Sequence, residues 1–66
     1  MKLLKMYKDN FGKWEETTFE KEEHILKDHY TDIEVVKEAL KRGDVVGTTF
    51  SMYKIPMSEI KKKERR

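Results

Sequence analysis

The sequence predicts a small α+β domain: a three-stranded antiparallel sheet, made of a hairpin and a C-terminal strand, packed on two short helices in a helix-turn-helix-like arrangement. Two Thr-x-x-Glu capping boxes, Thr17 with Glu20 and Thr31 with Glu34, mark the starts of two helices. A strand-like run precedes the first box and another follows the second helix. The first helix has almost no linker before the second begins, which is typical of a helix-turn-helix.

The N-terminal residues predict the hairpin. Residues 2–8 alternate as a strand does, with Leu4 and Met6 on one side. The Asp-Asn-Phe-Gly run at 9–12 is typical of a turn, and 13–16, which contains Trp14, returns as the second arm. An isolated hairpin is barely stable, so we expect its apolar side to pack on the rest of the chain.

The two predicted helices span about Phe19 to His29 and about Asp32 to Arg42. Their first turns are rich in acids and their last turns contain bases, which agrees with the helix dipole. Glu22 falls on the apolar side of the first helix, and we expect its carboxylate to escape to the edge. Gly43 is placed to end the second helix as a C′ residue.

Residues 45–55 predict the third strand. Val46, Thr48, Phe50 and Met52 line one face of this strand, and we expect Phe50 and Met52 in the core. Pro56 stops the run because it lacks a ladder donor. Residues 1–57 then form a single domain, and 58–66 form a basic tail. Residues 57–66 either continue as a frayed helix capped by Ser58 or are disordered, and we expect disorder past Ile60. The predicted core comprises Leu4, Met6, Trp14, Phe19, Ile25, Leu26, Val36, Leu40, Phe50 and Met52.

Composition and charge restrict the function classes. The chain has 66 residues and no cysteine, so we expect neither a disulfide framework nor a thiolate metal site. Apolar runs are too short for a membrane helix or a signal peptide, which favours a cytoplasmic location. Residues 1–60 carry ten basic and twelve acidic residues, whereas 61–66 carry five basic and one acidic, so the net charge of +2 comes from the tail.

No residue pattern points to catalysis, a cofactor or a small-molecule substrate. His24 and His29 are five residues apart, so they do not share a helix face as paired metal ligands would. The chain has no phosphate-binding loop and no nucleophile elbow. So small a core hardly encloses a reaction pocket, and we expect a non-enzymatic protein without metal or cofactor.

The leading functional hypothesis is a small regulatory DNA-binding protein. The second helix, about 32–42, would enter the major groove of double-stranded DNA, and the tail would follow phosphates. The candidate contacts are basic: Lys37, Lys41, Arg42, Lys61, Lys62, Lys63, Arg65 and Arg66.

The order strand, turn, strand, Thr-capped helix, helix, Gly, strand resembles a known pattern over about residues 4–55. The residues that carry it are Tyr7, Gly12, Thr18, Ile25, Leu26, Val36, Leu40, Gly43, Tyr53 and Ile55. The chain is similar to small phage-encoded helix-turn-helix modules and to the DNA-binding repeats of intron-encoded homing nucleases. That resemblance implies a phage or mobile-element origin, a second helix that reads the major groove and a role in transcription regulation.

The alternative hypothesis is a protein-protein interaction module or inhibitor of phage or mobile-element type. A basic protein partner would bind an acidic surface formed by Glu15, Glu16, Glu20 and Glu23, and Phe11 at the turn would either cover the hairpin or contact the partner. A homodimer through the exposed edge of the last strand, Thr48 to Tyr53, belongs to the same class. An aromatic platform for unpaired bases, made by Trp14, Tyr7, Phe11 and Tyr53, is weaker because a small core needs its large side chains inside.

Overall fold

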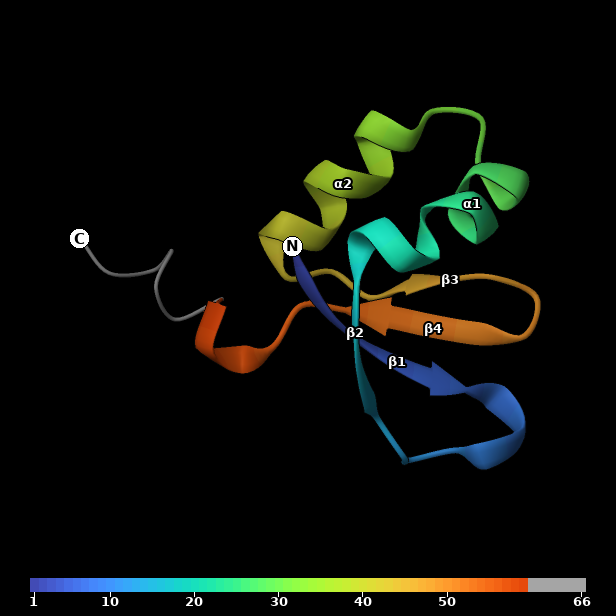
Figure 1. Cartoon of the computed structure of the whole chain (residues 1–66), viewed down its shortest axis with the longest axis vertical. Helices are drawn as coiled ribbons and strands as arrows, with labels where there is room; N and C mark the ends of the chain where they lie inside the picture. Colours follow the sequence, from blue (N-terminus) through green and yellow to red (C-terminus); the bar gives the residue numbers. More distant parts are fainter. Residues whose placement is uncertain (60–66) are drawn as a thin grey trace.

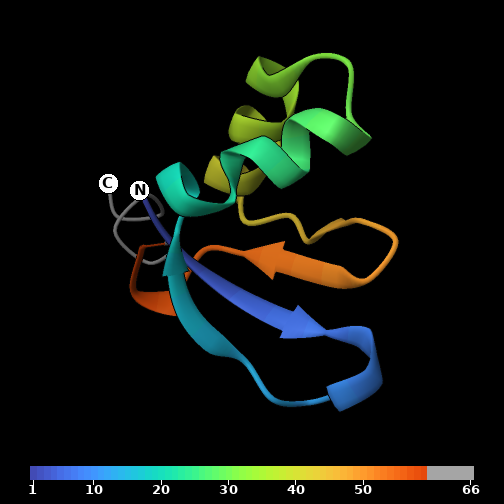
Figure 2. The same cartoon turned by 45° about the vertical axis from the view of Figure 1, so that its right-hand side comes forward.

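A computed structural model describes residues 1–59 and shows an α+β fold with two layers. Both helices, α1 (Phe19–His29) and α2 (Ile33–Arg42), cover one face of an antiparallel sheet, and the other face carries no helix (Figures 1 and 2). The sheet has four strands, not the three predicted, in the order β2-β1-β4-β3. The helix-turn-helix character of the two helices stays a prediction.

The N-terminal hairpin is confirmed, with shifted ends. Strand β1 (Lys2–Tyr7) pairs with β2 (Glu15–Thr18), and Leu3 lies opposite Thr17. The connection contains a short 3₁₀ helix, η1 (Lys8–Asn10), and Gly12 at φ 93°. Because this loop is longer than the predicted turn, the second arm begins two residues later than expected.

Both helices occupy the predicted ranges, but their caps lie one residue later than the capping boxes indicate. Thr18, not Thr17, accepts the capping bond from the Lys21 amide at 3.3 Å. Asp32, not Thr31, accepts from the Glu34 amide at 3.1 Å. Thr17 instead belongs to β2, where its hydroxyl has a different role. Gly43 ends α2 at φ 98°, a left-handed conformation that a side chain disfavours, as predicted.

The predicted third strand is two strands. Residues 45–55 form a tight hairpin of β3 (Val46–Gly47) and β4 (Ser51–Lys54), because Thr48 and Ser51 close a turn between them. Strand β4 also pairs with β1, so it lies inside the sheet and has no free edge. The expected free edge at Thr48 to Tyr53 is therefore wrong, and a homodimer through that edge loses its basis.

The core lies between the sheet and the helices, and the strand faces were assigned the wrong way round. Its buried apolar residues are Leu3, Phe19, Leu26, Val36, Leu40, Val46, Tyr53 and Ile55. Phe50, predicted inside, is 76% exposed because it sits at the tip of the new turn. Leu4, Trp14, Ile25 and Met52 are only half-buried. Inward-facing residues of β1 and β4 are Leu3 and Tyr53, which have the opposite parity.

A small second cluster explains how the helix-free face holds Met6 and Trp14. Met6 is buried, lies opposite Met52 in the sheet, and accepts a hydrogen bond from the Gly12 amide at its sulfur, 3.0 Å away. The Lys54 ammonium lies 4.3 Å from the centre of the Trp14 ring. Trp14 therefore covers the sheet beneath a cation-π contact and does not enter the main core.

The C-terminal residues described are Pro56 to Glu59. Residues 57–59 are helical, and the Glu59 amide donates to the Pro56 carbonyl at 3.0 Å. Most of the predicted tail, residues 60–66, lies outside the described residues. Along residues 1–59, no helix has the length and apolar character needed to cross a bilayer.

Candidate interaction surfaces

Two turns at one end of the sheet hold the most exposed aromatic side chains of the described residues. The loop after β1 and the β3–β4 turn both lie at this end (Figures 1 and 2). The Lys8 amide donates to the Phe50 carbonyl at 2.9 Å, which joins the two turns directly. Phe11 is 79% exposed and Phe50 76% exposed, and Tyr7 on the neighbouring strand end is partly exposed. We call Tyr7, Phe11 and Phe50 the aromatic end.

Local hydrogen bonds hold Phe50 outward. The Thr48 hydroxyl accepts from the Ser51 amide at 3.2 Å, and the Thr48 amide donates to the Ser51 carbonyl at 2.8 Å. The two hydroxyls lie 3.0 Å apart, and both residues are buried. These bonds satisfy the polar groups of the turn internally, so Thr49 and Phe50 remain at its tip.

The first turn is fixed in a similar way. The Lys13 amide donates to the Asn10 carbonyl at 3.2 Å, and the Gly12 amide bonds the Met6 sulfur. Phe11 follows η1 with backbone angles φ −58° and ψ 135°, and its side chain is exposed. From the sequence, Phe11 either covers the hairpin or is exposed to a partner, and in the structure its side chain is exposed.

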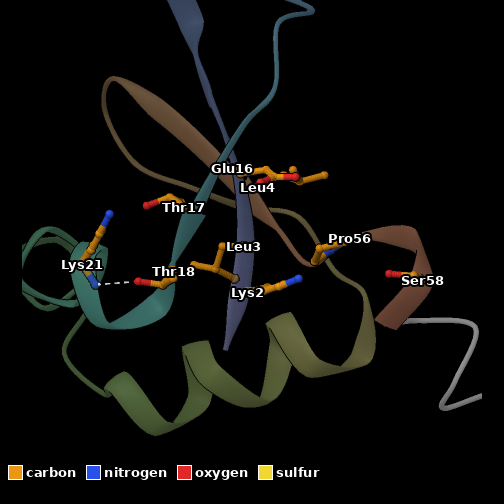
Figure 3. A pocket seen from close by; sticks show the side chains of 9 residues that line it. All are labelled: Lys2, Leu3, Leu4, Glu16, Thr17, Thr18, Lys21, Pro56 and Ser58. Carbon is orange, nitrogen blue, oxygen red and sulfur yellow. Dashed lines mark hydrogen bonds between the residues drawn. The ribbon is translucent and has the colours of Figure 1, made fainter.

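A shallow pocket of about 360 Å³ lies at the opposite end of β1 and β2 (Figure 3). Its lining includes Lys2 from β1, Lys21 from α1, and Pro56 and Ser58 from the segment after β4. The Thr18 hydroxyl at its wall already accepts the capping bond of α1. The lining is mixed in charge because Glu16 also contributes, so it selects no class of small ligand.

A buried polar cluster joins α1 to three strands. The Glu22 carboxylate, on a residue only 8% exposed, accepts from Lys5 Nζ at 3.0 Å, Thr17 Oγ1 at 2.8 Å and Tyr53 Oη at 2.9 Å. The expectation that Glu22 escapes to the edge is therefore wrong. Three donors from β1, β2 and β4 make its burial tolerable.

The same contacts perturb the ionisation of this cluster. Burial by itself would raise the pKa of Glu22, but the hydrogen bonds from Thr17, Lys5 and Tyr53 outweigh it and hold the pKa below its usual value. Burial would lower the pKa of Lys5, and its contacts with Tyr7 and Glu22 raise it instead. Burial, together with the Glu22 carboxylate, raises the pKa of Tyr53. Tyr53 is fully buried and its hydroxyl bonds Glu22, so the cluster connects strand β4 to helix α1 inside the protein.

The predicted DNA contacts on α2 differ in exposure and in intramolecular contacts. Lys37 is half-buried, with its Nζ 5.4 Å from the centre of the Phe19 ring. Lys41 and Arg42 are both exposed, and Arg42 forms an ion pair with Asp44 at 2.8 Å. The remaining predicted contacts, Lys61, Lys62, Lys63, Arg65 and Arg66, lie outside the described residues.

The predicted acidic surface is divided between two elements. Glu15 and Glu16 are exposed on β2, at the edge of the sheet. Glu20 lies 3.4 Å from the N-terminal amine, and Glu23 lies 3.4 Å from Lys27. Two of the four carboxylates therefore have intramolecular partners, although these surface pairs are weak.

His24 and His29 are both exposed on α1. Within residues 1–59 no three metal-binding side chains come together.

Sequence reasoning missed Phe50 as a surface residue. The run Gly47-Thr48-Thr49-Phe50-Ser51 contains Gly, two Thr and Ser, which are common turn residues, and that signal was available. The β-branched and aromatic content of the run favoured a continuous strand instead.

Comparisons of this chain with family models, curated proteins and solved structures gave no match.

Proposed function

We propose that this chain is a non-enzymatic protein-protein interaction module whose contact surface is the aromatic end. The observation that carries the proposal is the exposure of Phe11 and Phe50 on two adjoining turns. Neither ring belongs to the core cluster, so neither supports the fold. Aromatic side chains are enriched at protein interfaces relative to the rest of the protein surface.

The way the two turns are held suits recognition. Aromatic anchors dominate many protein interfaces because they bury a large area with few rotatable bonds. The Thr48–Ser51 bonds and the Lys8–Phe50 bond fix both backbones before a partner arrives. A partner with an apolar pocket would therefore bind with little loss of backbone entropy. The loop that carries Phe11 has two exposed lysines, Lys8 and Lys13, and one exposed acid, Asp9, and this excess of positive charge favours a partner whose rim is acidic.

The test is a pull-down with the full chain from a lysate of the organism that encodes it. Phe11→Ala/Phe50→Ala should lose the partner captured by wild type, and Met57→Ala, which removes a comparably exposed apolar side chain elsewhere, should retain it. Thermal melts of all variants check the fold. Equal capture by wild type and the double variant would refute the proposal.

The acidic surface is tested in the same assay. Glu16→Lys/Glu20→Lys/Glu23→Lys should retain the partner if the aromatic end makes the contact. Loss of capture by this triple variant, with retention by Phe11→Ala/Phe50→Ala, would favour the acidic surface over the aromatic end.

DNA binding is the second candidate function. The supporting observation is the basic C-terminal end of α2, where Lys41 and Arg42 are exposed, together with a tail of net charge +4 at residues 61–66. A mobility-shift titration on duplex DNA should show binding at tens of micromolar that weakens steeply with salt, on the order of tenfold or more between about 50 and 200 mM. Absence of any shift at low salt would reject this candidate.

A further inference from the structure

We infer that α2 is also a self-association surface, on which a second copy of this chain packs with its own α2 antiparallel. A groove of about 280 Å³ runs between α2 and the start of β3. Its lining is mainly apolar, and it includes Val35 at 62% exposed and Val45 at 51% exposed. None of Tyr7, Phe11 and Phe50 lines this groove, and the inference does not rest on the proposed function.

A helix fits this groove better than a strand, because β3 offers little for a strand to pair with. Strand β3 has only two residues, and the Tyr30 hydroxyl already donates to the Gly47 carbonyl. An added peptide strand would find few free backbone groups on that edge. A helix requires no free backbone groups on its partner, since it satisfies its own backbone hydrogen bonds and contributes only side chains to the contact.

One side of α2 and its cap carries a stripe of residues that is complementary to itself. The cap residue Asp32 lines the groove together with Val35 and Ala39, and Arg42 lies three residues beyond Ala39. Intervals of three, four and three residues place these side chains along one side of the helix. A two-fold axis perpendicular to α2, at the level of residue 37 along the helix, would set Val35 against Ala39 of the other copy. The same axis sets Asp32 against Arg42 of the other copy, twice per dimer.

The chemistry of the end residues permits these two ion pairs. One oxygen of Asp32 caps the Glu34 amide, and the second carboxylate oxygen can accept from a partner. Arg42 uses one nitrogen toward Asp44, and its guanidinium has further donors. In a parallel arrangement like charges would meet, so charge alone selects the antiparallel one. The small Ala39 opposite Val35 allows the helices to approach closely.

The interface is small, and its strength is limited accordingly. The ten residues of α2 extend over about 15 Å. Such a contact is at the low end of specific interfaces, so we expect a dissociation constant on the order of tens of micromolar. Dimerisation would double the number of aromatic ends presented to a partner.

Sedimentation velocity of the full chain across about 5–500 µM tests the inference. Wild type should move from monomer to dimer over this range. Val35→Lys should weaken the dimer at least about tenfold, whereas Met57→Lys, an equivalent change at another exposed apolar residue, should stay within about twofold. A wild type that remains monomeric throughout, or equal effects of the two lysine variants, would overturn it.

A charge-swap pair supplies the sharper test. Arg42→Glu alone and Asp32→Arg alone each place two like-charge contacts in a homodimer, so each should be monomeric. Mixed together, they regain both ion pairs, and the mixture should dimerise with an affinity within about threefold of wild type. Circular dichroism of each variant checks that α2 persists. Two helical variants whose mixture does not associate would refute the antiparallel arrangement.

Discussion

Removal of the Glu22 carboxylate is the most informative perturbation of this fold. Glu22→Ala leaves Lys5 with its ammonium beneath α1 and no anionic partner, since Glu22 is the acid that Lys5 contacts at 3.0 Å. Breaking a buried ion pair by removing one member costs about 3–5 kcal/mol. The side chain of Lys5 is 11% exposed and that of Glu22 is 10% exposed, so water reaches the ion pair only slightly. The lower end of that range, about 3 kcal/mol, is the expected loss in unfolding free energy.

That loss is large for a chain of this size. Unfolding free energies of about 0.05–0.15 kcal/mol per residue give 66 residues a total of about 3–10 kcal/mol. Urea denaturation, followed by the fluorescence of the single Trp14, measures the change. With a slope of about 1 kcal/mol per molar urea, the midpoint should fall by about 3 M. The matched control is Glu23→Ala, which removes a carboxylate one residue along whose side chain is 39% exposed, and it should cost less than about 0.5 kcal/mol. Equal losses of unfolding free energy in Glu22→Ala and Glu23→Ala would show that the buried ion pair does not stabilise the fold.

The pH dependence follows from the same cluster. The pKa of Glu22 is lower in the folded chain than in the unfolded chain, so its stabilisation is present above about pH 4.3 and is lost as the pH falls through the folded-state pKa. Glu22→Gln should flatten the acid limb of a stability-against-pH curve, and an unchanged acid limb would contradict this assignment. Lys5→Met/Glu22→Leu should recover much of the stability lost in Glu22→Ala, because a buried ion pair replaced by apolar side chains is often neutral; a double variant as unstable as Glu22→Ala would show otherwise. Gly12→Ala should cost about 1 kcal/mol through its φ of 93° alone, since no atom lies within 4 Å of an added Cβ, whereas Gly47→Ala should be neutral within about 0.5 kcal/mol. Thermal melts that rank these two glycine variants the other way would contradict the turn geometry. Phe11→Ala/Phe50→Ala should change the unfolding free energy by less than about 0.5 kcal/mol, as measured in urea, because both rings are exposed; a larger loss would show that the rings support the fold.

Helix positions were predictable from the sequence because their signals are local. The apolar period, the acidic first turns and Gly43 act within a few residues, and both helices lie in the predicted ranges. The caps moved by one residue because Thr-Thr and Thr-Asp each offer two adjacent capping side chains. Thr17 was then free to donate to Glu22.

The sheet was harder to predict because strand faces depend on distant partners. Leu3-Leu4 and Met52-Tyr53 place an apolar residue on both faces, so alternation alone does not say which side meets the helices. The parity was settled by the pairing of β1 with β4 and by the Glu22 cluster, which draws Lys5 and Tyr53 inward. The division of residues 45–55 into two strands depends on Thr48 side-chain bonds that β propensity does not register.

The predicted binding residues show the same limit. Phe11 could be identified from its place in a turn, but Phe50 could not be separated from the core while its strand was read as continuous. Lys37 and Arg42 were chosen by charge, and their intramolecular contacts with Phe19 and Asp44 depend on the fold.

Photo-crosslinking from the aromatic end shows whether this surface contacts a partner protein. A photoreactive phenylalanine analogue replaces Phe50 in one protein and Met57 in another, and both are irradiated in a lysate of the encoding organism. We expect a crosslinked protein at position 50, abolished by excess unlabelled wild type but not by excess Phe11→Ala/Phe50→Ala, and no such band at position 57. Equal crosslinking at both positions, or equal competition by the double variant, would contradict an interaction surface at the aromatic end.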